Sequence, residues 1–106
     1  MGDVIATMDI VGLKASGEEV RIHAQIGRPY RAEADDQPGG WACPVELEPL
    51  YSNLPHIRGI DSFHAIWLAA SLVLKLLKHF RENGGQLLNE DGSEFPLDAY
   101  AAGLGE

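Results

Sequence analysis

The most specific chemistry that this sequence offers is a cysteine nucleophile. Cys43 is the single cysteine of the 106-residue chain, and a reactive thiolate needs a lowered pKa and a base close by. His56 or His64 could supply that base, and Asp61 could orient it. The sequence does not show that these side chains meet, and Cys43 shares the apolar parity of its segment. We therefore interpret it as a small buried hydrophobic residue.

The histidines and the cysteine do not have the spacing of a metal site. Structural zinc ligands usually come in close pairs, with roughly two to five residues between the members. Cys43, His56 and His64 are spaced much more widely. The run 89–92 also departs from a calcium-binding EF-hand loop, because its glycine comes too early. We therefore predict no metal and no cofactor.

Five side chains are candidates for a binding surface. Tyr30 and Trp41 lie at the ends of a glycine-rich loop, where exposed aromatic residues make good contact anchors and buried ones would only close the core. Asp61 stands at a predicted helix start, where both a cap and a functional carboxylate fit, and capping is the more common role. Arg21 and Glu46 belong to a polar sheet face that is described below.

One long helix must position these candidates. Residues 60–85 predict an α-helix of about six turns, because the interior of the stretch contains no proline or glycine. Asp61 or Ser62 can supply its N-cap. Gly84 and Gly85 stand where a left-handed residue ends a helix.

The apolar residues of this helix predict burial on more than one side. One stripe follows the i, i+3, i+4, i+7 spacing of a buried face, and a second apolar set flanks it. Either the strands and loops of the chain or a second subunit covers the extra face, and we favour the chain itself. The longest nearly uncharged run, residues 65–74, is well short of the roughly 20 residues of a membrane span. The stripe contains Phe63, Ile66, Trp67, Ala70, Val73, Leu74, Leu77 and Phe80, and the flanking set contains Ala65, Leu68, Ala69, Leu72 and Leu76.

Three segments before the helix predict strands. Residues 4–14 are rich in β-branched and apolar side chains, residues 19–28 alternate cleanly between apolar and polar, and residues 41–47 alternate again. The turn 15–18 joins the first two segments as a hairpin, and Pro44 makes the third an edge strand or a bulged one. If the strands pair in sequence order, one sheet face is polar, and its charges either pair across strands or dock a partner. This face carries Asp9, Arg21, His23, Glu46 and Glu48.

Together these elements predict an α+β fold in two layers. A three-stranded antiparallel meander packs its apolar face on the long helix, and residues 86–95 add a short C-terminal hairpin. Residues 49–59 form a connector that packs over the second face of the helix, residues 32–40 form a loop, and the last residues fray. The chain, residues 1–106, forms a single domain.

The charge of the chain disfavours several classes of partner. The formal net charge is −8, and nucleic-acid binding needs clustered lysine and arginine residues for the phosphates. An anionic membrane is disfavoured for the same reason, whereas a basic protein suits such a surface. The single cysteine has no internal disulfide partner, and the N-terminus lacks the basic and apolar regions of a signal peptide. We therefore expect a cytoplasmic protein.

Several short motifs are spread over most of the chain. They are Gly27-x-Pro29-Tyr30, Trp41-x-Cys43-Pro44-Val45, Leu50-Tyr51, Gly59-x-Asp61-Ser62-Phe63-x-Ala65-x-Trp67-Leu68-Ala69, Gly84-Gly85-x-Leu87 and Phe95-Pro96. With them the chain resembles a family of small bacterial proteins that is catalogued as a domain of unknown function. The resemblance implies a similar fold and no particular activity. Some small acidic bacterial proteins of this kind resemble immunity proteins, which neutralise a cognate toxin.

Two functions follow as hypotheses. The first is a non-enzymatic domain that binds another protein, as an inhibitor or an immunity protein, or that self-associates, for instance as a homodimer. The second is a small enzyme or ligand-binding domain with a pocket near Cys43 and Asp61.

Overall fold

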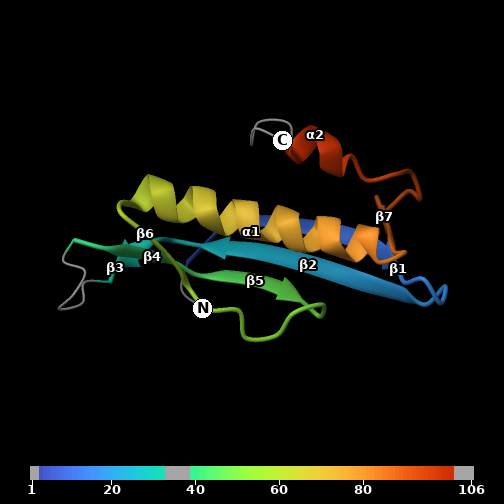
Figure 1. Ribbon diagram of the computed structural model, residues 1–106, viewed down its shortest axis with the longest axis horizontal. Coiled ribbons are helices and arrows are strands. Elements are labelled where there is room, and N and C mark those ends of the chain that lie inside the picture. The colour runs from blue at the N-terminus through green and yellow to red at the C-terminus, as the bar shows by residue number, and fades with distance from the viewer. Residues whose placement is uncertain (1–2, 33–38, 102–106) are drawn as a thin grey trace.

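The computed structural model describes residues 3–32 and 39–101 and shows an α+β fold, as predicted (Figure 1). The helix α1 lies along antiparallel strands, and α2 lies beside α1 (Figure 1). Most of the predicted loop 32–40 and the predicted frayed end fall on 33–38 and 102–106, outside the described residues. The elements are β1 (Val4–Leu13), β2 (Glu19–Gly27), β3 (Tyr30–Arg31), β4 (Trp41–Cys43), β5 (Val45–Glu48), β6 (Ile57–Gly59), α1 (Ser62–Glu82), β7 (Gln86–Leu88) and α2 (Leu97–Ala101).

The larger sheet has the strand order β5-β2-β1-β7, with antiparallel pairing throughout. The predicted hairpin forms its centre. Its turn closes where the Lys14 N–H donates to the Glu18 carbonyl, at 2.9 Å. Gly17 takes a φ of +91°, which glycine adopts without steric cost. This turn sets the register that places Asp9 beside His23.

The predicted single strand 41–47 is wrong, because the chain changes sheets at Pro44. Before it, β4 pairs with β3 and β6 in a second, three-stranded sheet, and after it, β5 pairs with β2. Proline has no N–H for a ladder, while the Pro44 carbonyl still accepts a hydrogen bond from the Gly27 N–H, at 2.9 Å. The predicted meander is therefore β1, β2 and β5 of a larger sheet, and β6 lies in the segment that was predicted to be a connector.

The C-terminal hairpin predicted for residues 86–95 is present only in part. Its first strand, β7, joins the main sheet beside the end of β1. The return segment makes a single bridge, between Leu88 and Glu94. The hairpin therefore extends the main sheet along a short part of one edge.

The long helix begins and ends close to its predicted limits. Asp61 is the N-cap, and its carboxylate accepts a hydrogen bond from the His64 N–H, at 2.7 Å. Gly84 follows the helix with a φ of +93°, and its N–H donates to the Arg81 carbonyl, at 3.1 Å. The capping residues thus satisfy backbone groups that a helix end leaves open.

The core lies between α1 and the two sheets. Ala65 and Ala69 are fully buried, and these small residues let the helix start approach the second sheet closely. A Cβ atom on Gly59 of β6 would lie 2.5 Å from the backbone nitrogen of Ala65. The buried apolar cluster also contains Ile10, Ile22, Ala24, Cys43, Val45, Leu47, Val73, Leu77, Leu87, Phe95 and Leu97.

The predicted burial of the whole helix stripe is wrong at its N-terminal end. Phe63 is 78% exposed and Trp67 is 44% exposed. The strands cover the face that carries Ala65 and Ala69, about 120–160° around the helix from Phe63 and Trp67. Ala65 and Ala69, which the sequence pattern placed in the flanking set, therefore form the central contact between α1 and the strands.

Candidate functional site

Cys43 has the environment of a core residue. It lies at the end of β4 and is 0% exposed. Its thiol donates a hydrogen bond to the Gly27 carbonyl, with an Sγ–O distance of 3.3 Å. Burial raises the pKa of the Cys43 thiol, whereas a nucleophile needs a lowered pKa. This environment disfavours a thiolate at neutral pH.

The two candidate bases have other partners. Nδ1 of His56 shares a hydrogen bond of 2.6 Å with the Tyr30 hydroxyl. Nδ1 of His64 accepts a hydrogen bond from the Ile60 N–H, at 3.1 Å. Within residues 3–32 and 39–101, no group of three or more His, Cys, Asp or Glu side chains is placed to hold a metal ion.

The polar side chains of the main sheet pair with one another, across neighbouring strands at His23 and Glu46 and with the turn after β7 at Arg21. The His23 Nδ1–H donates to the Asp9 carboxylate, at 2.6 Å, and this bond is the main reason that the pKa of His23 is raised above 6.5. Arg21 donates to both oxygens of Glu90, at 3.0 and 3.2 Å. Glu46 accepts from the neighbouring glutamine of β2, at 3.1 Å. These charges thus have partners within the chain. Of the two alternatives for this face, internal pairing or docking of a partner, the contacts agree with internal pairing.

The predicted aromatic anchors Tyr30 and Trp41 are also engaged within the chain. Tyr30 is 42% exposed and is held by its hydrogen bond to His56. The guanidinium of Arg31 lies 5.6 Å from the centre of the half-buried Trp41 ring, which is the geometry of a cation–π contact. Both side chains lie on the small sheet, at the same end of the molecule as the helix start (Figure 1).

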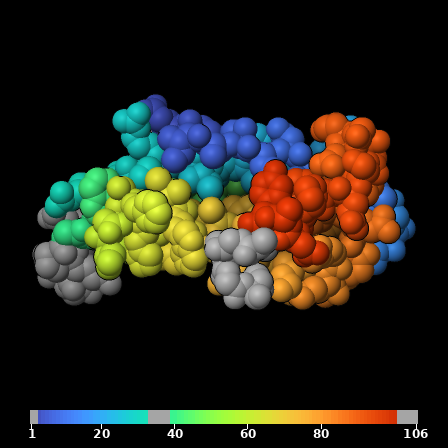
Figure 2. All heavy atoms as spheres, turned by 90° about the horizontal axis from the view of Figure 1, so that it is seen from above, coloured from blue at the N-terminus to red at the C-terminus, as the bar shows by residue number. Residues whose placement is uncertain are grey.

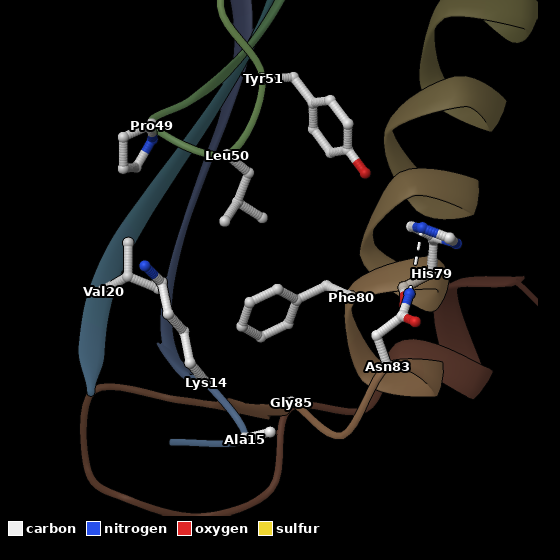
Figure 3. A pocket seen from close by; sticks show the side chains of 10 residues that line it. All are labelled: Lys14, Ala15, Val20, Pro49, Leu50, Tyr51, His79, Phe80, Asn83 and Gly85. Atoms are coloured by element: carbon white, nitrogen blue, oxygen red, sulfur yellow. Dashed lines mark hydrogen bonds between the residues drawn. The ribbon is translucent and has the colours of Figure 1, made fainter. Parts of the chain in front are cut away.

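A cavity of about 500 Å³ lies at the C-terminal end of α1. The β1–β2 turn, the turn after β5 and the last helical turn surround it (Figure 3). Phe80 and Leu50 point into the cavity, and Tyr51 and His79 line it from opposite sides (Figure 3). Lys14 also lines it, and its ammonium pairs with Glu18 at 3.3 Å. This cavity lies at the opposite end of α1 from Asp61.

The most exposed large apolar side chains of the helix region form a patch at its start. We call Ile60, Phe63 and Trp67 the helix-start patch. Ile60 and Phe63 are each 78% exposed, and Trp67 is 44% exposed. Sequence periodicity missed this patch, because it identifies the residues that share a helix face and does not show which face is covered.

A second apolar feature lies along β1. β7 pairs only with residues 11–13 of β1, so residues 4–10 form an edge that no described strand covers, which we call the open β1 edge. Val4 and Ile5 on it are 43% and 48% exposed. An apolar groove of about 210 Å³ runs between this edge and α1, lined by Met8, Leu74 and Tyr100 among others. Figure 2 shows β1 in blue along one long margin of the molecule.

By length and composition alone, α1 is also able to cross a membrane. Core helices of water-soluble proteins meet the same criterion, and α1 packs against both sheets. The absence of a membrane role remains a prediction from the sequence.

Comparisons with known proteins give no assignment. A scan against protein-family models, a search of curated proteins and a search of solved structures each return no match for this chain. The resemblance to a bacterial family of unknown function therefore remains a prediction.

Proposed function

We propose that this chain is a non-enzymatic protein-binding domain of the inhibitor or immunity type, and that it docks its partner through the helix-start patch. The observation that carries the proposal is the 78% exposure of both Ile60 and Phe63 on an otherwise ordered helix start. Large apolar side chains that are exposed close together in one stretch of chain are typical of interaction surfaces.

The patch has the composition of a binding hot spot. Phe63 and Trp67 are one turn apart on the same side of α1, so one partner pocket can take both rings. Aromatic residues dominate measured hot spots, and burying one phenylalanine contributes about 1.5–3 kcal/mol. A partner of modest size therefore gains most of its affinity from these two side chains.

The charge of the chain adds long-range attraction to a basic partner. The net charge is −8, and charges that are not paired at the contact mainly raise the association rate, at low salt above all. The apolar patch would then hold the complex, while the acidic surface speeds its formation. Added salt is expected to slow association and to leave dissociation almost unchanged.

The test is affinity capture from a lysate of the source organism with the immobilised 106-residue chain. Wild type is compared with Phe63→Asp, which replaces the ring, and with Gln86→Glu, a control that adds the same charge at an exposed position beyond the far end of α1. We expect one stoichiometric partner with wild type and with Gln86→Glu, and its loss with Phe63→Asp. Recovery of the same partner by all three proteins would contradict docking at the patch.

A ligand-binding role is the second candidate, and the cavity at the end of α1 supports it. Its apolar floor of Phe80 and Leu50, beside Tyr51 and His79, suits a small amphipathic molecule that carries one ring and one acid or hydroxyl group. Titration of ¹⁵N-labelled protein with benzoate and phenol tests this role. Shifts confined to residues around Phe80 would support it, and an unchanged spectrum at millimolar probe would remove it.

A further inference from the structure

We infer that two copies of this chain join through the open β1 edge, antiparallel and centred on Thr7, and so form one continuous sheet with four strands from each copy. The inference concerns a surface separate from the helix-start patch and does not depend on the proposed function. Its basis is the open edge, residues 4–10, beside the part of β1 that β7 covers.

The hydrogen bonds of the hairpin fix which amides face the open edge. In antiparallel strands the N–H and C=O of one residue point to the same side, and successive residues alternate. The Lys14 N–H donates to the Glu18 carbonyl, so the even-numbered residues of β1 face β2 as far back as Ala6, where the regular register begins. Thr7 and Asp9 therefore present their backbone groups to the open edge.

The length of the edge favours a two-fold arrangement. An antiparallel copy with Thr7 opposite its own Thr7 pairs residues 6–8 in regular register, brings the bulged residues 4–5 opposite residues 9–10, and stops before β7. Ala6 then faces Met8 of the second copy, and directly opposed residues lie on the same sheet face. Both of these side chains line the groove beside α1. The segment is about 24 Å long at about 3.4 Å per residue.

The charges on the edge favour a second copy over a basic partner. Residues 4–8 carry no charged side chain, so two chains of net charge −8 can approach there without opposing carboxylates. A basic partner would find no acid on this stretch to pair with. The two carboxylates that flank this stretch have partners in their own chain. Asp9 is bonded to His23 and would face Ile5 of the second copy, and Asp3 pairs with Arg28 at 3.5 Å. The edge also lacks the lysine or proline that usually protects an edge strand of a monomer.

The groove beside the edge would be closed by the same two-fold contact. Its lining is almost wholly apolar, with Ala6 and Met8 on the β1 side and Ala70 and Leu74 on the α1 side. Tyr100 lines it as well and is 51% exposed. In the dimer, the grooves of both copies lie next to the two paired β1 strands. Side chains of one copy therefore cover the groove of the other.

The first test is the mass of the 106-residue chain in solution, from sedimentation between about 10 μM and 1 mM. We expect a concentration-dependent species of twice the 11.5 kDa chain mass. A constant mass of 11.5 kDa over this range would overturn the inference. Phe63→Asp should leave the mass of the dimer unchanged, so failure here and failure of the proposed function are distinguishable.

The second test uses the two-fold axis itself. Thr7→Glu and Thr7→Lys each place like charges opposite one another, and each should raise the dimer dissociation constant about fivefold, whereas an equimolar mixture should restore association. Thr7 is exposed on the polar face, so both variants should fold. Ser52→Glu and Ser52→Lys, at an exposed position of the connector, are the matched controls and should dimerise as wild type does.

A third variant addresses the backbone. Thr7→Pro removes the N–H at the centre of the pair and should raise the dissociation constant at least tenfold, to a first approximation. A dimer that is unchanged in all three Thr7 variants uses another surface and overturns the inference. A monomeric wild type that captures another protein, and loses it with Thr7→Pro, would also overturn it, because the edge would then bind a foreign strand.

Discussion

At the scale of single residues, the polar side chains of this molecule mostly stabilise structure. The Asp9–His23 hydrogen bond joins two neighbouring strands, and Asp61 caps the helix. Cys43 fills the core and donates to a backbone carbonyl. The residue types from which chemistry could be predicted therefore have structural partners, and exposed hydrophobic residues are the better functional candidates.

The raised pKa of His23 gives a first prediction. Its hydrogen bond to Asp9 favours the protonated form in the folded state, so the folded-state pKa lies above 6.5. The resulting stabilisation is fully present below pH 6.5 and is lost as the pH rises through the folded-state pKa. In an NMR titration, Asp9→Asn should lower the pKa of His23, while Asp91→Asn, at an exposed turn, should leave it unchanged. Equal pKa values in wild type and Asp9→Asn would refute this assignment.

The buried thiol of Cys43 gives a second prediction. Because Cys43 is 0% exposed and burial raises its pKa, alkylation by iodoacetamide at neutral pH should be slow in buffer and fast in denaturant. Ser52→Cys supplies an exposed thiol on the same chain as an internal standard. Labelling of Cys43 in the native protein as fast as that standard would revive the nucleophile hypothesis.

At the scale of elements, local sequence signals predicted the helix and the first hairpin well. Caps, glycine positions and alternation act over a few residues, so they can be read without the fold. The change of sheet at Pro44 could not be predicted in this way, since it depends on two strands that pair with distant segments. The hairpin turn sets the register of Asp9, Arg21 and His23 on the polar face, whereas Glu46 and Glu48 reach this face through the pairing of β5 with β2.

The role of Asp61 gives a prediction at this scale. Its carboxylate accepts from the His64 N–H, so Asp61→Ala should lower the free energy of unfolding by about 1 kcal/mol. Asp61→Asn keeps a capping oxygen and should stay within about 0.5 kcal/mol of wild type. Urea denaturation measures both values. Equal losses in the two variants would show that the charge matters and that the cap does not.

At the scale of the whole molecule, the face of α1 that the strands leave uncovered determines which apolar side chains are exposed. Two sheets meet α1 along Ala65 and Ala69, and this choice exposes Phe63 and Trp67. Periodicity could not predict it, because α1 is apolar over most of its circumference. The molecule thus combines an acidic surface with two separate apolar surfaces, the helix-start patch and the open β1 edge.

Replacement of Phe63 separates function from folding at this scale. Since the ring is 78% exposed, Phe63→Asp should change the free energy of unfolding by no more than about 0.5 kcal/mol. An aspartate near the helix N-terminus also interacts favourably with the helix dipole. Urea denaturation of this variant beside Gln86→Glu checks the expectation, and a loss of several kcal/mol would show that Phe63 belongs to the core.

The most direct test of docking at the helix-start patch is the affinity of the captured partner for wild type and for Phe63→Asp, measured by titration calorimetry with purified proteins. We expect a one-to-one complex with wild type and a dissociation constant at least about 30-fold higher with Phe63→Asp, as for a hot-spot aromatic residue. Gln86→Glu should bind as wild type does. Equal affinities for wild type and Phe63→Asp would contradict the helix-start patch as the docking surface.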